Sequence, residues 1–291
     1  MIPERFPPDP VPAIRPLPEY LAEGRTKARY EDMKQVFQVP WMGVVTMALA
    51  HYPTLFDTFW EGLRELSASV PFVEASRGLR SRVEEEVAGL APPPIAGRLR
   101  EAGYGPREID DIRAMVEVFS HGNHAYLPLI ALVALLLEGE EPRGGGDAPP
   151  FVGRHGPAGD SPFVLMEYHH ADAPTRAVYD DIRATLGLPF VNTDYRAFAR
   201  WPSWFAMAWR DLRPHPGSDP HEAICRAVHD RAFAAALALP NPAGLRAVDL
   251  IQAAETDAGI DELRQVARLF YWLIPGLVTN VAFIRHQLLA D

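Results

Sequence analysis

The residues in this sequence best suited to chemistry are Asn192, Thr193 and Asp194, which follow a proline break and precede a helical pattern. Asn, Thr and Asp are typical helix caps, because their side-chain oxygens accept hydrogen bonds from the free amides of the first turn. The same position also suits catalysis. A carboxylate there stays ionised and can accept a proton from water, and the free amides can bind an anion. The pattern leaves both interpretations open.

A second polar group, HGNHAY, lies beside a long apolar run. Asn123 and Tyr126 offer an amide and a phenol that suit a bound water or a polar substrate group. A plain turn at Gly122 explains them nearly as well. His121 and His124 would share a helix face, but no third ligand stands at the spacing of known metal sites, so we predict no metal here.

The charge balance argues against nucleic acid as a partner. The chain of 291 residues has 28 basic and 38 acidic residues, a formal charge of −10 that opposes a phosphate backbone, and no basic run interrupts this trend. The proline-rich, charged opening differs from a signal peptide. The longest apolar run, Ala125 to Leu137, is too short to span a bilayer and contains Pro128, which predicts a buried, kinked helix and no membrane partner.

Cys225 is the one cysteine of the chain. A lone cysteine forms no internal disulfide, no redox pair and no multi-thiolate zinc site. We therefore expect a reducing, cytoplasmic location.

Two long segments of the chain are similar to each other. The 35 residues that begin at Tyr30 align without a gap with those that begin at Tyr179, and ten pairs are identical. A second pair of similar segments ends at Phe119 and Phe270. Chance is a poor explanation, so we predict an internal duplication across nearly the whole chain.

Each aligned segment has the pattern of a helix, a break, a short helix and another helix. Apolar residues recur at three- and four-residue steps, which is typical of one buried helix face. Pro40 and Pro189 follow the first helix and end it. Pro53 and Pro202 stand where the last helix can begin, because the first helical position needs no amide donor.

These elements predict an all-α fold of two similar helical repeats related by a pseudo-two-fold axis. We expect an extended arm over residues 1–25, the first repeat over 26–138, a linker over 139–165 and the second repeat over 166–291. Half of the residues from Gly139 to Pro162 are glycine or proline, which predicts a flexible crossing segment. Phe163 to Tyr168 have the composition of a strand, but a lone strand has no partner for its backbone.

A position that is apolar in one repeat and acidic in the other does not serve the packing that the repeats share. Asp194 aligns with Val45, and Asn192 aligns with Gly43. This difference singles out Asp194 as the candidate base.

At YEDMKQVFQVPW, FSHGNHAYLPLI and NTDYRAFARWP the sequence resembles the group I 2-haloacid dehalogenases, an all-helical, duplicated family. The resemblance covers most of the chain, and the motifs follow in the family's order. It implies hydrolysis of 2-halocarboxylic acids to 2-hydroxy acids, with water as the second substrate and no cofactor. It further implies a site between the two repeats and a homodimer.

The resemblance also implies site residues. The family's essential aspartate falls on Asp194, its neighbouring hydroxyl residue on Thr193 and its pocket tryptophan on Trp41. Its Gly-Asn-x-x-Tyr pair falls on Asn123 and Tyr126. By this resemblance, Asp194 and Asn123 hold and deprotonate a water that attacks the α-carbon directly, with inversion, while the substrate carboxylate lies on backbone amides near Thr193.

Some positions differ from the family or carry its specificity. Val44 stands at a pocket position that is aromatic in the family, and Ala125 replaces a common lysine. Asn192 matches members restricted to the D form, whereas members that accept both enantiomers have a small residue there. The resemblance therefore implies a preference for D-2-haloacids. The resemblance assigns no family position to Tyr271 or Trp272, and so leaves the halide side of the pocket open.

Other interpretations compete with this one. The repeat YDDIRATLGLPF is also similar to carboxymuconolactone decarboxylase and alkyl hydroperoxidase relatives, but Cys225 alone cannot supply the cysteine pair that the peroxidases need. A non-catalytic helical binding or scaffold protein would keep the repeat without needing Asp194. A hydrolase acting on another small carboxylic acid is a further alternative.

Overall fold

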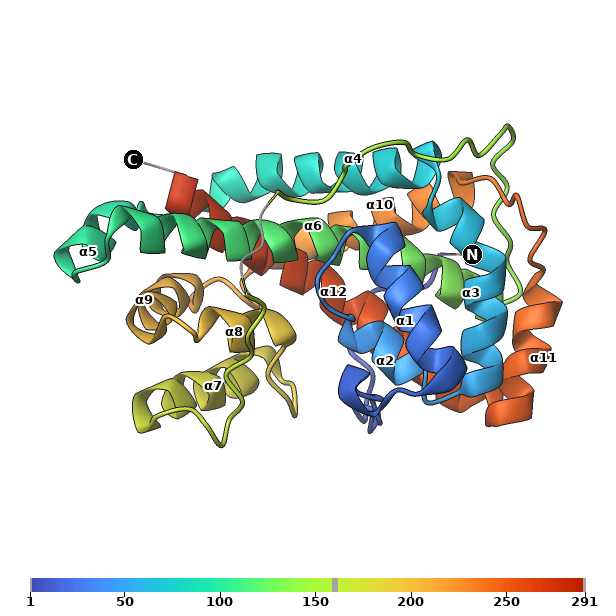
Figure 1. Cartoon of the computed structure of the whole chain (residues 1–291), viewed down its shortest axis with the longest axis horizontal. Helices are drawn as coiled ribbons and strands as arrows, with labels where there is room; N and C mark the ends of the chain where they lie inside the picture. The colour runs from blue at the N-terminus through green and yellow to red at the C-terminus, as the bar shows by residue number, and fades with distance from the viewer. Residues whose placement is uncertain (1, 159–161, 290–291) are drawn as a thin grey trace. The chain divides into compact units, whose positions relative to one another are not determined.

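The computed structural model describes residues 2–158 and 162–289 (Figure 1). Over these residues the protein has twelve α-helices, two short 3-10 helices and no named strand, and one isolated β-bridge joins Ser69 and Pro150. The all-α fold predicted from the sequence is confirmed. Residues 163–168, despite their strand-like composition, form no strand.

The helices follow one another at short intervals, except for the long segment between α6 and α7. Residues 2–18 precede the first element and form neither helix nor strand. The elements are η1 (Glu19–Leu21), α1 (Gly24–Phe37), α2 (Val44–Leu49), α3 (Pro53–Ser67), α4 (Val70–Val87), η2 (Ala88–Leu90), α5 (Ala96–Glu101), α6 (Pro106–Leu137), α7 (Ala173–Leu186), α8 (Thr193–Phe198), α9 (Pro202–Leu212), α10 (Asp219–Ala238), α11 (Ala247–Asp257) and α12 (Ile260–Leu289).

The chain divides into two compact units, each assembled from three separate segments. Unit 1 comprises Met1–Arg80, Gly122–Gly156 and Arg226–Pro275, and unit 2 comprises Ser81–His121, Pro157–Cys225 and Gly276–Asp291. Unit 1 contains α1, α2, α3 and α11, whereas unit 2 contains α7, α8 and α9. The sequence predicts two contiguous repeats, whereas each of these units contains segments from both halves of the chain. The boundaries of the repeats stay a prediction.

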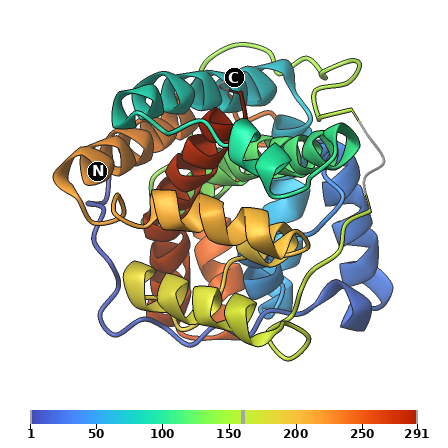
Figure 2. The same ribbon diagram turned by 90° about the vertical axis from the view of Figure 1, so that its left-hand side faces the viewer.

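Within each unit the helices bury the apolar faces that the sequence predicts. In unit 1, α1, α2 and α11 pack against α3. In unit 2, α7 and α9 run side by side, and α8 contacts α9 (Figure 2). Tyr30, Met33 and Phe37 of α1 are buried, as are Tyr179 and Ile182 of α7. Burial of such large side chains is the main favourable contribution to folding.

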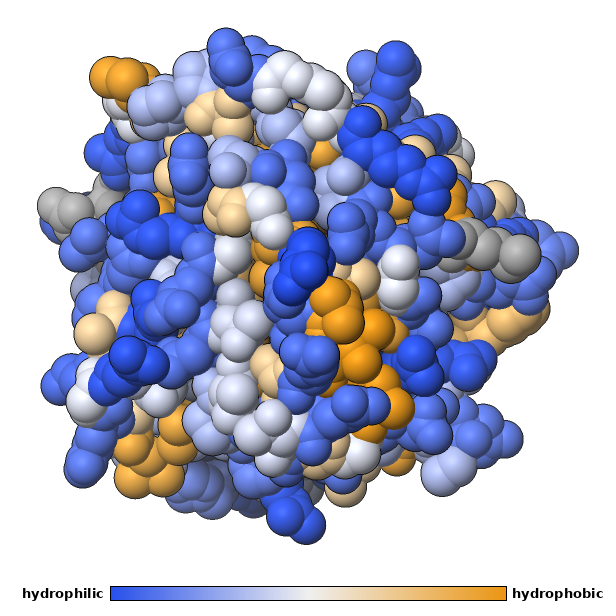
Figure 3. All heavy atoms as spheres, turned by 90° about the vertical axis from the view of Figure 1, so that its right-hand side faces the viewer, coloured by the Kyte–Doolittle hydropathy of each residue, from blue (hydrophilic) through white to orange (hydrophobic). Residues whose placement is uncertain are grey.

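Hydrophilic residues predominate on the face of the molecule drawn in Figure 3, and apolar residues appear there in small groups. Isolated apolar side chains are ordinary on protein surfaces. The large exposed ones are Phe6, Tyr20, Leu21, Val152, Val164, Tyr168, Val248 and Leu289.

The helices of the two aligned segments have corresponding bounds. The offset that pairs Tyr30 with Tyr179 also pairs both ends of α1 with those of α7, both ends of α2 with those of α8, and the start of α3 with that of α9. The residues after α1 and α7, Gln38 and Gly187, both adopt the left-handed conformation, with φ of 51° and 66°. The predicted order of helix, break, short helix and helix is therefore present in both units.

The two units also anchor their first helix in the same way. The hydroxyl of Tyr30 donates to the carbonyl of Leu17 (2.9 Å), and the hydroxyl of Tyr179 donates to the carbonyl of Met166 (2.7 Å). These four residues correspond under one gapless offset. In each unit a buried tyrosine thus ties the chain before the helix to the helix itself.

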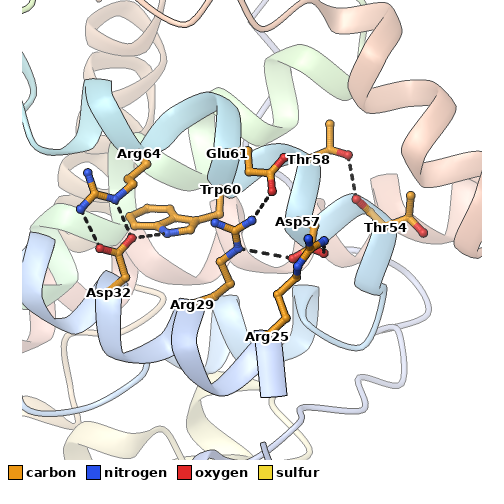
Figure 4. Close-up of polar contacts among 9 residues, drawn as sticks. All are labelled: Arg25, Arg29, Asp32, Thr54, Asp57, Thr58, Trp60, Glu61 and Arg64. Atoms are coloured by element: carbon orange, nitrogen blue, oxygen red, sulfur yellow. Dashed lines mark hydrogen bonds and ion pairs between the residues drawn. The ribbon is translucent and has the colours of Figure 1, made fainter. Parts of the chain in front are cut away.

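A carboxylate joins α1 to α3 in unit 1 (Figure 4). Asp32 accepts hydrogen bonds from the indole N–H of Trp60 (2.8 Å) and from two nitrogens of Arg64 (both 2.7 Å). Arg29 on the same helix bonds to Asp57 of α3 (3.4 Å) and to Glu61. Ion pairs therefore link the polar sides of α1 and α3. Of these carboxylates, Asp32 is the one that also accepts a hydrogen bond from the buried indole of Trp60.

Unit 2 contains the corresponding contact. Asp181 accepts from the indole of Trp209 (2.8 Å) and from Arg213 (2.6 Å). The hydrogen bond from Arg213 lowers the pKa of Asp181, as the one from Arg64 lowers the pKa of Asp32. Both carboxylates therefore favour the folded state when they are ionised.

Asp32→Asn is expected to lower the free energy of unfolding by roughly 1 to 3 kcal/mol, because the buried indole N–H and the guanidinium lose a charged acceptor. Since the folded pKa of Asp32 is depressed, its contribution is present above the ordinary pKa of about 3.9 and is lost as the pH falls through the folded pKa. Urea unfolding between neutral pH and pH values below about 4 measures this loss, which should be smaller in the variant.

Asp180→Asn is the matched control for this prediction. Its exposed carboxylate pairs with Arg183 three residues away and accepts a hydrogen bond from the hydroxyl of Tyr168 (3.2 Å). Exposed pairs of this kind contribute less than about 1 kcal/mol. Equal losses of stability in the two variants would show that the contact with Trp60 has no special weight.

Two helices, α6 and α12, are long and apolar enough to cross a membrane by length and composition. Their most apolar windows of 18 residues are 94% and 83% buried inside the protein, which is typical of core helices. All residues from Ala125 to Leu137 are buried, as predicted, and α6 continues through Pro128.

Residues 143–156, in the segment that the sequence predicts to be a flexible linker, form hydrogen bonds to other parts of unit 1. Its backbone bonds to the end of α10, to the connection between α3 and α4, and to the side chain of Gln38. Glycine and proline permit its path, but partners distant in sequence fix it. The pairs include Arg143 N with Leu237 O, Phe151 N with Ala68 O, and His155 N with Gln38 Oε1, each at 2.8 Å.

Candidate active site

Asp194 lies in the first turn of α8, and only 2% of its surface is exposed. Its counterpart in α2, Val45, is 3% exposed, so the two aligned helices bury a carboxylate and an isopropyl group at the same position. Burial of a carboxylate costs free energy that burial of valine does not. A buried acid that the shared packing does not need is a candidate catalytic group.

Asn192 precedes α8, but its side chain makes no capping hydrogen bond. It is 6% exposed, and its amide oxygen is buried without a partner in the protein. Asp172 at the start of α7, by contrast, accepts from the amide of Thr175 (2.9 Å). The capping interpretation is therefore wrong for Asn192, and its oxygen can accept a hydrogen bond from water or a ligand.

Thr193 is also buried, and its hydroxyl accepts a hydrogen bond from Arg196 (3.2 Å). The same guanidinium pairs with Glu167 (2.6 Å). Sequence reasoning missed Arg196, although it aligns with the apolar Met47. Arg196 would be found by the criterion that singles out Asp194 if that criterion included basic residues as well as acidic ones.

Tyr195, the residue after Asp194, belongs to a buried polar chain of unit 2 that sequence reasoning also missed. Asn280 of α12 donates to the hydroxyl of Tyr195 (3.0 Å), and its amide oxygen lies 2.7 Å from Nε2 of His221. Burial raises the pKa of Tyr195, the hydrogen bond from Asn280 opposes this effect, and the charge of Asp194 adds to it. The phenol therefore stays protonated.

Trp41 and Tyr126 come together in unit 1. The amide of Gly43 donates to the hydroxyl of Tyr126 (2.9 Å), which donates in turn to the carbonyl of Trp41 (3.3 Å). A Cβ at Gly43 would lie 2.7 Å from the Tyr126 ring, so this close approach requires glycine. The hydrogen bonds of Tyr126 fix the backbone of residues 41–43 just before α2. Val44, the first residue of α2, is half-buried.

Gly122 lies inside α6, so the alternative of a plain turn at this residue is wrong. A Cβ there would lie 2.3 Å from the Trp41 ring, which means that glycine makes room for the indole. Asn123 and His124 follow on the same helix, at 6% and 2% exposure. Among the described residues, the one cluster able to hold a metal includes neither His121 nor His124.

Comparison with known proteins identifies the family. No family model matches the chain. It is 45% identical over 246 residues to the (R)-2-haloacid dehalogenase of Rhizobium sp. (strain NHG3), a match that covers 83% of this chain and 94% of the relative. The chain belongs to the D-2-haloacid dehalogenase family. It is also 39% identical over 280 residues to the (R)-2-haloacid dehalogenase of Pseudomonas putida, covering 95% and 93% of the two chains.

A solved structure of a D-2-haloacid dehalogenase mutant in complex with D-2-CPA has the same fold. Its TM-score is 0.88 at 35% identity, over 99% of each chain. The family resemblance inferred from the motifs is therefore confirmed. Trp41 and Tyr126 contact each other in unit 1, and Asn192, Thr193 and Asp194 are consecutive in unit 2, but their joint role in one dehalogenase site stays a prediction.

Proposed function

We propose that this protein hydrolyses D-2-halocarboxylic acids to 2-hydroxy acids. The structural observation that carries the proposal is the burial of Asp194 at the start of α8, where α2 carries valine. The (R)-2-haloacid dehalogenases at 45% and 39% identity support the substrate class and the preference for one enantiomer.

In the proposed reaction a water oxygen attacks the α-carbon of the substrate, and the carbon–halogen bond breaks as the halide leaves with the bonding electron pair. Asp194 accepts the proton that the water loses. Attack opposite the halogen inverts the configuration of the α-carbon. Burial strengthens the interaction of Asp194 with that water, because opposite charges and dipoles attract more strongly at low dielectric constant.

The remaining residues have proposed roles from the family resemblance. Thr193 and the backbone amides near it hold the substrate carboxylate. The amide oxygen of Asn192 has no partner in the protein, which supports a place for the Asn192 side chain beside the α-carbon of the substrate. Trp41 and Tyr126, with Val44, line the pocket. Asn123 belongs to unit 1, and its part in holding water is proposed on the family motif alone.

We also propose that the chain arose by internal duplication and acts as a cytoplasmic homodimer without a cofactor. The corresponding bounds of α1 and α7, with their matched tyrosine and aspartate contacts, support the duplication. Light scattering after gel filtration tests the dimer, which should give twice the chain mass of 32.3 kDa.

Halide release from racemic 2-chloropropionate tests the proposed function against a non-catalytic scaffold. The enzyme should release chloride from no more than about half of the racemate and leave the L form, because one enantiomer is excluded. Chiral analysis of the residual acid and of the hydroxy acid measures both the preference and the inversion. A folded protein that releases no chloride from any 2-haloacid would support the scaffold.

A single turnover in heavy-oxygen water, with enzyme in excess, separates water attack from an ester of Asp194. Direct attack puts the label into the hydroxy acid during the first turnover. Hydrolysis of an aspartyl ester would deliver an unlabelled carboxylate oxygen to that first product. Mass spectrometry is expected to find labelled product, and unlabelled first-turnover product would contradict direct attack.

A further inference from the structure

A cluster of three potential metal ligands lies on α10 in unit 2, and the proposed dehalogenation uses none of them. His221, Glu222 and Cys225 each present one ligand atom, and these atoms lie within 4.8 Å of one another. His221 and Cys225 are four residues apart, so they share a helix face, and both are buried. The Glu222 side chain is 33% exposed and leaves a route to solvent.

Two of the three separations between the donor atoms are close to those around a tetrahedral ion, and the third, between sulfur and the carboxylate oxygen, is at most 4.8 Å. Cys225 Sγ lies 3.5 Å from His221 Nδ1, and a Glu222 carboxylate oxygen lies 3.8 Å from the same nitrogen. Zinc bonds of about 2.3 Å to sulfur and about 2.0 Å to nitrogen, at a tetrahedral angle, place sulfur and nitrogen about 3.6 Å apart. The corresponding nitrogen–oxygen separation is about 3.4 Å, which a small rotation of the half-buried Glu222 side chain reaches.

The other ring nitrogen of His221 is already oriented for this purpose. The amide nitrogen of Asn280 donates to the hydroxyl of Tyr195 (3.0 Å), which leaves the amide oxygen of Asn280 to face His221. That oxygen lies 2.7 Å from Nε2 of His221 and can only accept a hydrogen bond, so Nε2 carries a proton. Nδ1 is then the nitrogen that faces Cys225. Metal-bound histidines usually have such an outer hydrogen bond, which fixes the tautomer and the ring orientation.

We propose that His221 Nδ1, the Cys225 thiolate and a Glu222 oxygen bind one divalent cation of the zinc type. A water completes the tetrahedron, and the thiol proton passes to solvent together with the proton that Nδ1 carries when the imidazole is charged. A thiolate with an imidazole selects zinc over magnesium and calcium, which prefer oxygen ligands. The cation joins α10 through Asn280 of α12 to Tyr195, the residue after the proposed base, and takes no part in the displacement at carbon.

Titration of the full chain with cobalt(II) tests this site without reference to activity. Cys225 is the one cysteine, so a thiolate-to-cobalt charge-transfer band can come from no other residue. The band should saturate at one cobalt per chain and disappear when zinc is added, because zinc prefers this ligand set. A folded protein that shows no such band with excess cobalt would overturn the proposal.

Two variants and a control complete the test. Cys225→Ser should abolish the band, and Glu222→Gln, on a partly exposed side chain, should weaken cobalt binding by at least about tenfold. Asp230→Asn is the control, since Asp230 lies beside His229 on the same helix (2.9 Å) and should not affect the titration. Cobalt binding of equal strength in the Glu222→Gln variant and the unsubstituted protein would mean adventitious binding and would overturn the three-ligand site.

Discussion

Asp194→Asn is expected to abolish dehalogenation in a protein that remains folded. The amide has nearly the same shape as the carboxylate but cannot take a proton from water, and loss of a general base costs about 10²- to 10⁴-fold in turnover. The substitution also keeps a polar side chain of the same size at this buried position, so the protein should stay folded. Chloride release and thermal unfolding, measured on the same sample, check both parts. Retained turnover in the folded variant would remove Asp194 as the base.

Asp181→Asn provides the matched control, because that carboxylate joins α7 to α9 through Trp209 and Arg213. It should lose stability and keep turnover, the opposite of the result expected for Asp194. Adding Val45→Asp to the Asp194→Asn variant should restore nothing, since the new acid in α2 is not preceded by the Asn192 and Thr193 that accompany the base in α8.

Asn192→Ala is expected to raise the turnover of L-2-chloropropionate relative to the D form by about tenfold or more. The amide would fill the space that the substituent of the L enantiomer needs, and alanine opens that space. Because the Asn192 side chain makes no capping bond and its oxygen has no partner in the protein, the variant should not lose the roughly 1 kcal/mol that removal of a true cap costs.

Kinetics with the separate enantiomers measure this ratio, and thermal unfolding measures the stability. Unchanged turnover of the D form would show that the site is intact. An unchanged enantiomer ratio in an active variant would mean that Asn192 does not select the substrate. If the variant instead lost about 1 kcal/mol of stability, as proteins do when a capping residue is removed, the role of Asn192 would be structural.

The sequence predicts the helices well where local signals decide them. Pro53 and Pro202 begin their helices as expected, because proline at the first helical position costs no hydrogen bond. The conformation of Gly122 is harder to predict, since glycine is common in turns. It lies inside α6, and glycine is needed there because the Trp41 ring, distant in sequence, occupies the space that a side chain would fill.

The partners of the candidate site were the least predictable part. Asn280 and Tyr195 are separated by 85 residues, and no local pattern relates them. A signal nevertheless existed: the alignment that pairs Phe119 with Phe270 places Asn280 opposite the apolar Leu129. Asp194, Arg196 and Asn280 are all polar residues that stand opposite apolar residues in the aligned segments. Comparison of the aligned segments therefore finds candidate residues, whereas the structure is needed to find their hydrogen bonds.

The hydrogen bonds that hold residues 143–156 in unit 1 also bear on how the chain resists proteolysis. Arg143 and Arg154 are exposed and offer trypsin two cleavage sites in a segment rich in glycine and proline. A protease must bind its substrate as an extended, unpaired backbone, and here the flanking amides are bonded to the end of α10 and to Gln38. Trypsin therefore cleaves only when these hydrogen bonds break and residues 143–156 separate from the rest of unit 1. The rate of cleavage measures how often this local opening occurs.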